Sequence, residues 1–392
     1  MPPLRGHRRR RLLAALTWAA ALMILAILYH KQSTEPKDNN TNNAQHIGNE
    51  DGNHHYSHTI PSKKIWQVTG DSKVQPARDC ARPWIASNPG WAHTLHTDST
   101  AAAFAFAAAQ KQKQKQKQKQ QHRDVVDGDD DDDNNNNYDR LAEALGQLRS
   151  RGVRADLIRY MLLGAEGGVY TDLDTVPLRG GIDDWLPWGY WLDRGARLVV
   201  GVEWDELASD PDPDPDPDPD PDSEGGDQTE RSRNRPKGVL HPVQFCQWTI
   251  VATSPGHPVF KAMISRALAM LAGHQALWGA AALGQVVLSE QDVLNITGPA
   301  AWTEVLLAHM RGFDDDDKPA WAGLELELSR DLSGLRAPRL VGDVLVLPVD
   351  AFASGMEHSG STRAGDGVPE VAVLRHLFRG SWREGNGDGD LC

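Results

Sequence analysis

Two aspartates one residue apart, Asp172 and Asp174, are the clearest candidates for chemistry in this sequence. They follow the apolar and aromatic stretch Gly-Gly-Val-Tyr-Thr at 167–171. Residues i and i+2 of a strand point the same way, so we predict that the two carboxylates converge at the end of a strand. Paired carboxylates with open positions suit Mn²⁺ or Mg²⁺. Such a cation neutralises charge on a departing diphosphate, so we predict a catalytic and metal-binding role for both aspartates.

The alternative is that this Asp-x-Asp is a solvated turn, since the chain holds 54 acidic residues and such a pair arises easily by chance. The context favours the metal site, because an apolar helical stretch, two glycines and an aromatic strand precede the pair. His376 is the candidate third ligand, and a contact to the diphosphate or a structural role remain open for it. Asp156 and Arg159 lie three residues apart in the preceding helical stretch and therefore share a face. If that face is exposed, they form only a weakly stabilising ion pair.

The elements that must position these residues alternate between strand and helix patterns. This predicts an α/β sheet with helices on both faces. Apolar runs predict strands at Lys64–Val68, Trp91–His96, Val169–Leu173, Leu198–Val202 and Val344–Leu347. Apolar residues at helical spacing predict helices at Tyr138–Leu148, Asp156–Leu163, Phe245–Val251 and Val259–Leu271.

The N-terminus predicts a membrane anchor. Residues 12–29 carry no charge and reach about 27 Å as a helix, close to the thickness of a bilayer core. Arginines 8–11 precede them, which places residues 1–11 in the cytosol and the rest in the lumen. A cleaved signal peptide is the alternative, but the segment lacks an Ala-x-Ala-like end. Residues 30–58 are polar and predict a disordered stem before a lumenal domain at 59–392.

Low-complexity tracts interrupt that domain, and we interpret the insertions at 110–137 and 210–236 as surface loops. They hold much of the net charge of −13, so the remainder is close to neutral and no broad basic face for nucleic acid is expected. Of the three cysteines, one pair is expected to form a disulfide in the lumen. The last residue, Cys392, is the expected free thiol.

Several blocks of sequence occur in a characteristic order: Ile65-Trp66-Gln67, the segment from Arg154 to Asp174, Gln244 to Thr249, Gly256-His257-Pro258, and Gly380-Ser381-Trp382. In this order they resemble glycosyltransferase family 32, and within it the initiation-specific alpha-1,6-mannosyltransferases of fungal Golgi membranes. The resemblance covers most of the chain from about Ile60 to Trp382.

The resemblance implies a GT-A fold, which is a Rossmann-like mixed sheet flanked by helices, and a Mn²⁺ (or Mg²⁺) cofactor. It also implies a GDP-mannose donor and transfer with retention of configuration. Donor contacts are expected from Trp66, Gln67, Asp156, Arg159, Tyr170, Ser381 and Trp382. The indole N–H of Trp382 can donate to a phosphate oxygen, and packing in the core is its alternative role.

The implied acceptor is the N-linked core oligosaccharide of glycoproteins, and the implied location is the Golgi membrane, with a single-pass type II topology. Two alternatives remain: a mannosyltransferase acting on inositol phosphorylceramide, and a non-catalytic subunit of a Golgi mannan-polymerising complex. No residue identifies itself as a nucleophile. Glu203, Asp205 and Gln244 are candidate neighbours of the reacting face.

Overall fold

The computed structural model describes residues 62–122, 132–206, 235, 238–312, 329–356, 360–363, 365–380 and 391–392. The expected cytosolic tail, membrane anchor and stem lie outside these residues, as do most of the tract at 210–236 and both Ser381 and Trp382. Within the described part of the chain, none of the helices combines the length and the apolar character needed to cross a bilayer.

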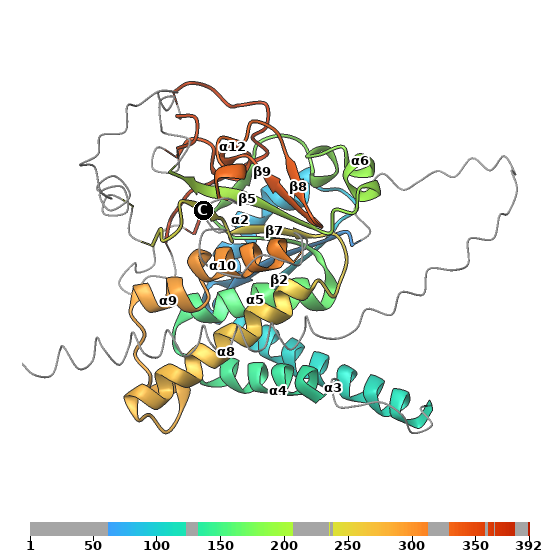
Figure 1. The fold of residues 1–392 in the computed structure, drawn as a ribbon, viewed down its shortest axis with the longest axis vertical. Helices are drawn as coiled ribbons and strands as arrows, with labels where there is room; N and C mark the ends of the chain where they lie inside the picture. The colour runs from blue at the N-terminus through green and yellow to red at the C-terminus, as the bar shows by residue number, and fades with distance from the viewer. Residues whose placement is uncertain are drawn as a thin grey trace, which may run out of the picture.

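A mixed sheet forms the centre of the molecule (Figure 1). Its strands are β2 (Ala92–Thr97), β1 (Lys64–Thr69), β3 (Gly168–Thr171), β7 (Thr249–Ala252), β5 (Leu198–Asp205), β9 (Val344–Leu347) and β8 (Arg339–Val341), in that spatial order. β1 runs parallel to both β2 and β3, and β5 runs parallel to β9, whereas β7 is antiparallel to its neighbours β3 and β5. A further strand, β6 (Val243–Phe245), pairs with the far end of β5. β3 and β5 therefore end at the same edge of the sheet.

Helices cover both faces of this sheet (Figure 1). One side carries α3 (Asp98–His122), α4 (Asp132–Gln147), α5 (Arg151–Glu166), α8 (Pro258–Trp278), α9 (Glu290–Ile296) and α10 (Pro299–Arg311). The other carries α2 (Val74–Ser87), α6 (Trp188–Asp193) and α12 (Val349–Ala353). Successive strand residues contribute to opposite cores: Tyr170 and Ile250 pack on the first side, Val169 and Val251 on the second. This alternation follows from the two-residue period of a strand.

The expected mixture of strands and helices is confirmed in most places. The stretch Phe245–Val251 is an exception, because it forms the end of β6, the connection at 246–248 and most of β7 rather than a helix. Its aromatic and β-branched residues fit a half-buried pleated surface better than a helix. The insertion at 110–137 is also less loop-like than expected, since α3 continues through residue 122 and α4 begins at Asp132. Gln and Lys are good helix formers, which accounts for the extension of α3.

A second, two-stranded sheet brings the C-terminal part of the chain to the end of β3. It pairs β4 (Thr175–Pro177) with β10 (Leu374–His376) in antiparallel register. A disulfide joins Cys80 on α2 to Cys392, while Cys246 is buried and free. The expectation that Cys392 would be the free thiol is therefore wrong. Sequence distance hid this pairing, because the two cysteines are 312 residues apart.

Candidate active site

The approach to the paired aspartates depends on two glycines between α5 and β3. Gly167 and Gly168 have φ of 64° and 94°, values that residues with a side chain rarely adopt. A Cβ on Gly168 would also lie 2.6 Å from the carbonyl oxygen of Lys64. The chain therefore reverses tightly after α5 and enters β3 in contact with β1, as the Gly-Gly pair predicts.

Asp172 and Asp174 lie in the turn that follows β3, which ends at Thr171. The Asp172 N–H donates to the Trp248 carbonyl oxygen at 2.8 Å. The Asp172 carbonyl accepts from Thr175 Oγ1 at 2.5 Å and from Gln67 Nε2 at 3.3 Å. The carboxylates thus converge because a hydrogen-bonded turn directs them, and not because of strand alternation as the sequence suggested.

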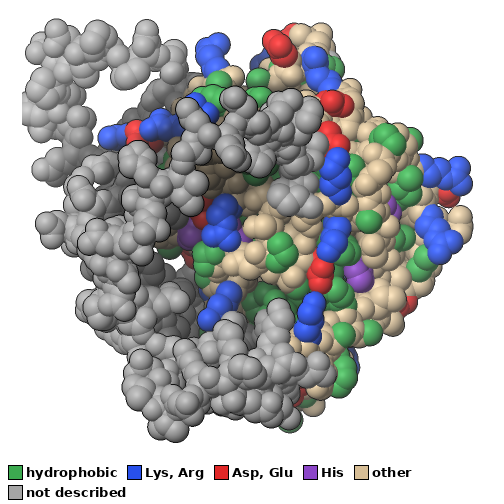
Figure 2. All heavy atoms as spheres, turned by 90° about the vertical axis from the view of Figure 1, so that its right-hand side faces the viewer, with side chains coloured by type: hydrophobic (Ala, Val, Ile, Leu, Met, Phe, Trp, Pro, Cys, Tyr) green, Lys and Arg blue, Asp and Glu red, His purple; other side chains and the backbone are tan. Residues whose placement is uncertain are grey.

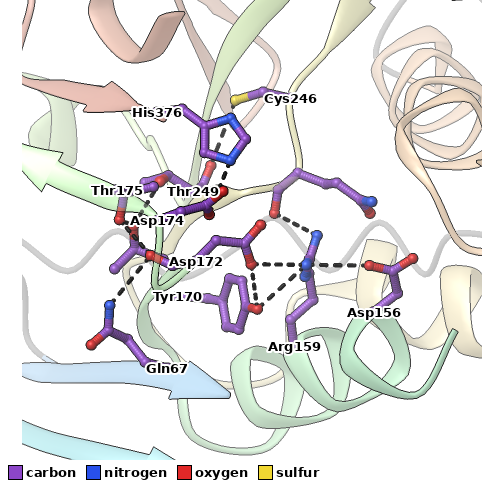
Figure 3. Close-up of polar contacts among 12 residues, drawn as sticks. Gln67, Asp156, Arg159, Tyr170, Asp172, Asp174, Thr175, Cys246, Thr249 and His376 are labelled. Atoms are coloured by element: carbon purple, nitrogen blue, oxygen red, sulfur yellow. Dashed lines mark hydrogen bonds and ion pairs between the residues drawn. The ribbon is translucent and has the colours of Figure 1, made fainter. Parts of the chain in front are cut away.

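The carboxylate of Asp172 is held on one side (Figure 3). Its Oδ1 accepts from Arg159 Nη2 at 3.0 Å and from the Tyr170 hydroxyl at 2.6 Å. The guanidinium also lies over the Tyr170 ring, 4.6 Å from its centroid. These contacts occupy one oxygen of Asp172, and Figure 3 shows the other oxygen with no contact to the residues drawn.

Arg159 is itself fixed by buried partners, and only 5% of its side chain is exposed. It pairs with Asp156 at 3.2 Å and donates to the Gln247 carbonyl at 3.0 Å. Asp156 accepts in turn from Thr297 Oγ1 at 2.8 Å. Burial alone would lower the pKa of Arg159, but the charge of Asp172 keeps it well above its usual value. Burial raises the pKa of Asp156 to about 6, against the effect of Arg159. The pair is therefore a buried anchor and not an exposed surface pair.

His376 on β10 reaches the second aspartate. Its Nε2 lies 3.2 Å from Asp174 Oδ1. The imidazole stacks on Trp248, with 4.5 Å between ring centroids and 13° between planes, and also contacts Phe378 at 3.9 Å. Burial alone would raise the pKa of Asp174, but the hydrogen bond and charge of His376 bring it below its usual value.

The residues after β10 wrap around Asp174. The Leu377 N–H donates to the Asp174 carbonyl at 2.7 Å, and the Arg379 N–H donates to its Oδ2 at 2.9 Å. Between them, Phe378 has φ 51°, which is rare for a residue with a bulky side chain. This conformation separates two N–H groups that both address Asp174, and strained backbone of this kind collects at functional sites.

The three predicted metal ligands come together. One ligand atom from each of Asp172, Asp174 and His376 lies within 4.8 Å of the others. Two carboxylates and one imidazole suit Mn²⁺ or Mg²⁺. Nδ1 of His376 is buried without a hydrogen-bond partner in the described structure, and its Nε2 is the atom directed at the aspartates. The residues present therefore fit a divalent cation.

A second group of potential ligands, His257, His309 and Asp343, is also close enough to hold an ion. It lies where β5 and β9 begin, at the opposite edge of the sheet. His257 Nδ1 accepts from the Val259 N–H at the start of α8, so the neutral ring carries its proton on Nε2, which faces Asp343. A protonated Nε2 has no lone pair for a metal. We therefore interpret His257, His309 and Asp343 as a structural cluster held by hydrogen bonds and charge.

The other predicted donor-binding residues divide into three sets. Gln67 and Tyr170 join the turn through the contacts above. Trp66 is buried, and its indole N–H donates to the Gly167 carbonyl at 2.7 Å, so this group is already committed within the fold. Ser381 and Trp382 lie outside the described residues.

Several residues that hold the site together were not among the predicted site residues. They supply backbone or hydroxyl partners to the charged network: Thr175, Gln247, Trp248 and Thr297. Gln247 and Trp248 lie in the block from Gln244 to Thr249 that carries part of the family resemblance. The resemblance draws attention to this block, but it cannot show which atoms of the site these residues contact.

Comparison with known proteins agrees with this geometry. Residues 76–189 match a family model described as a glycosyltransferase sugar-binding region containing a DXD motif. That range includes most of α2, all of α5 and β3, and the turn with both aspartates.

Three fungal proteins with the name initiation-specific alpha-1,6-mannosyltransferase are similar over longer stretches. The protein from Schizosaccharomyces pombe is 27% identical over 329 residues, which is 84% of this chain and 65% of that protein. The one from Candida albicans is 31% identical over 59% of this chain and 54% of its own length. The one from Saccharomyces cerevisiae is 24% identical over 59% of this chain and 63% of its own length. The chain thus matches less than two thirds of the length of each of these curated relatives.

Proposed function

We propose that the chain is a mannosyltransferase. Residues 76–189 match the sugar-binding region of the DXD glycosyltransferases, and longer stretches are similar to fungal proteins with the name initiation-specific alpha-1,6-mannosyltransferase. It takes mannose from GDP-mannose and forms an alpha-1,6 linkage to the N-linked core oligosaccharide of glycoproteins. The observation that carries the proposal is the convergence of Asp172, Asp174 and His376 at the edge where β3 ends. The mixed sheet with an acidic turn at that edge supports a GT-A fold, because α/β sheets place ligands at the carboxyl ends of strands.

The chain's own residues divide the work at this site. Asp174 and His376, together with the uncommitted oxygen of Asp172, would hold the cation. A divalent cation there supplies charge neutralisation for the departing diphosphate. Arg159 and Tyr170 keep the other oxygen of Asp172 fixed, so the carboxylate needs no reorganisation as charge develops.

The role of Asp156 and Arg159 changes with this geometry. The resemblance implies that both contact the donor, yet their charged atoms are largely used within the protein. We propose that Arg159 acts chiefly by fixing Asp172, and that Asp156 acts chiefly by fixing Arg159. Retention of configuration fits attack of the acceptor hydroxyl on the face from which the diphosphate leaves.

The proposed location is the Golgi membrane, with the catalytic domain in the lumen. The uncharged segment at 12–29 after four arginines supports a type II anchor. The disulfide between Cys80 and Cys392 supports an oxidising compartment, because such bonds are rare in the cytosol.

The test is to incubate the purified protein and Mn²⁺ with a panel of GDP- and UDP-sugars and a core N-glycan. Linkage analysis of the product follows. We expect mannose alone to be transferred, from GDP-mannose, in an alpha-1,6 linkage that is lost on adding a chelator. Transfer from a UDP-sugar, transfer to inositol phosphorylceramide only, or no transfer to any acceptor would contradict the proposal.

A further inference from the structure

Glu203 is placed by an irregularity in β5. Val202 pairs with Phe245 and Trp204 pairs with Gln244, so three residues of β5 span two residues of β6. Glu203 is the extra residue of this β-bulge. Bulges re-aim a side chain out of the regular alternation and are common beside active sites. This one lies near the end of β5, at the edge of the sheet that also carries Asp172.

A fully buried glutamine fixes the carboxyl group of Glu203. The Leu240 N–H donates to Gln244 Oε1 at 3.1 Å, which sets the orientation of the amide. The amide nitrogen therefore faces Glu203 and donates to its Oε2 at 3.2 Å, with a second contact to the Gly238 carbonyl at 3.3 Å. One oxygen of a half-buried carboxyl group is thus held in place, and its other oxygen has no protein partner in the described part of the chain.

The connection between β6 and β7 links Glu203 to the aspartate turn. The Cys246 N–H donates to the Gly201 carbonyl of β5 at 2.9 Å. Two residues on, the Trp248 carbonyl accepts from the Asp172 N–H at 2.8 Å. The buried thiol of Cys246 has a raised pKa, first because of burial and then because Glu203 and Asp172 are both near enough to act on it. The thiol lies 3.9 Å from the Thr249 carbonyl oxygen, at the start of β7 (Figure 3).

Asp205 and Gln244, the other two candidate neighbours of the reacting face, have structural roles. Asp205 is buried, and its two oxygens accept from Ser333 Oγ and the Gly334 N–H, both at 2.7 Å. Gln244 is enclosed and orients Glu203. Burial raises the pKa of Glu203 to about 7, and the hydrogen bond from Gln244 opposes this only in part. Among the described residues, the thiol of Cys246 is the ionisable group that lies close enough for Glu203 to affect its pKa, and a thiol cannot supply a positive charge.

We propose that Glu203 is a catalytic residue on the acceptor side, where its carboxylate binds the attacking hydroxyl of the acceptor sugar and takes the proton from it. The inference rests on the proposed function. In the step, the acceptor oxygen forms a bond to the anomeric carbon of the donor as the bond from that carbon to the diphosphate oxygen breaks. The electron pair of the broken bond leaves with the diphosphate, and the acceptor proton moves to Glu203.

The protonation behaviour favours this role over covalent catalysis. A base is most effective when its pKa lies near the working pH. A carboxylate nucleophile must instead stay ionised throughout the reaction, and no charged group among the described residues holds Glu203 in that form.

The first test compares the full-length protein with Glu203→Gln, which keeps the shape and the contact to Gln244. We expect kcat for transfer to a core N-glycan to fall by about 10²–10⁴-fold, because general-base catalysis contributes on that order. The affinity for GDP in the presence of Mn²⁺ should stay within about twofold, because the cation site is untouched. Glu143→Gln, at an exposed position of α4, is the matched control and should transfer like the original protein.

The pH profile supplies a test that does not depend on a folded variant. We expect kcat/KM for the acceptor to rise through an apparent pKa near 7 in the unchanged protein. A profile flat from pH 5 to 9, a Glu203→Gln variant within about threefold of the original rate, or a mannosyl adduct on Glu203 in mass spectra would each overturn the inference. If the unchanged protein transfers no mannose at all, the proposed function fails instead.

Discussion

One of the two carboxylate oxygens of Asp172 is already hydrogen-bonded within the protein. Arg159 and Tyr170 hold one of its oxygens, at 3.0 and 2.6 Å. The sequence identified the aspartate pair and its neighbours as site residues. It could not identify this clamp, because a hydrogen bond from a strand residue to a turn two positions later depends on how the turn closes. At this scale the residue types were predictable and their partners were not.

Replacing Tyr170 by Phe removes one of the two donors to Asp172 and leaves the ring under Arg159. We expect kcat for mannose transfer to fall by about tenfold, and the free energy of unfolding to fall by about 1 kcal/mol, as for one buried hydrogen bond. Steady-state kinetics and urea unfolding measure the two effects. Equal rates in Tyr170→Phe and the original protein would show that the clamp on Asp172 does not matter for turnover.

Some of the helices and strands that carry the site are predictable from the sequence, and others are not. The helix before the glycines and the strand after them were evident, because periodicity and turn residues agree there. The stretch Phe245–Val251 was misread as a helix, since its short apolar run fits either period. The pairing of β4 with β10 was beyond prediction, because Asp174 and His376 are 202 residues apart.

Away from the site, His257 ties the start of α8 to the loop before β9 through Asp343. Burial lowers the pKa of His257 below its usual 6.5, although the interaction of its Nε2 with the carboxylate of Asp343 acts the other way. The unfolded chain then binds a proton more readily than the folded one as the pH falls below 6.5. The contribution of His257 to the free energy of unfolding is therefore fully present above pH 6.5 and is lost as the pH falls below that value.

His257→Asn keeps a side chain that can cap α8 and removes the titrating group. We expect the free energy of unfolding of the variant to fall less steeply between pH 6.5 and 5 than that of the original protein. Denaturant titrations at several pH values measure this difference. Parallel slopes for the two proteins would rule out His257 as a source of the acid sensitivity.

At the scale of the whole molecule, the disulfide between Cys80 and Cys392 ties the last residue of the chain to α2. The segment in between carries His376, so the closed loop includes the third candidate ligand. The α/β class and most of the sheet followed from the sequence, but this closure did not, since three cysteines allow several pairings.

On the face shown in Figure 2, basic, acidic and apolar side chains are interspersed wherever the surface is not drawn grey.

Replacing both Cys80 and Cys392 by Ser removes the closure without leaving a lone thiol. We expect a loss of about 2–5 kcal/mol in the free energy of unfolding, because a long loop is released. The affinity for Mn²⁺ should also weaken, since β10 is less firmly held. A variant that binds Mn²⁺ as tightly as the original protein would show that the position of His376 does not depend on the disulfide.

The most direct test of the site is a calorimetric titration of GDP into the protein, with and without Mn²⁺, in the original chain and in Asp174→Asn. We predict that GDP binds tightly only with Mn²⁺, and that Asp174→Asn weakens this binding by about 100-fold or more while the protein stays folded. GDP affinity that is the same with or without Mn²⁺, and the same in both proteins, would contradict it.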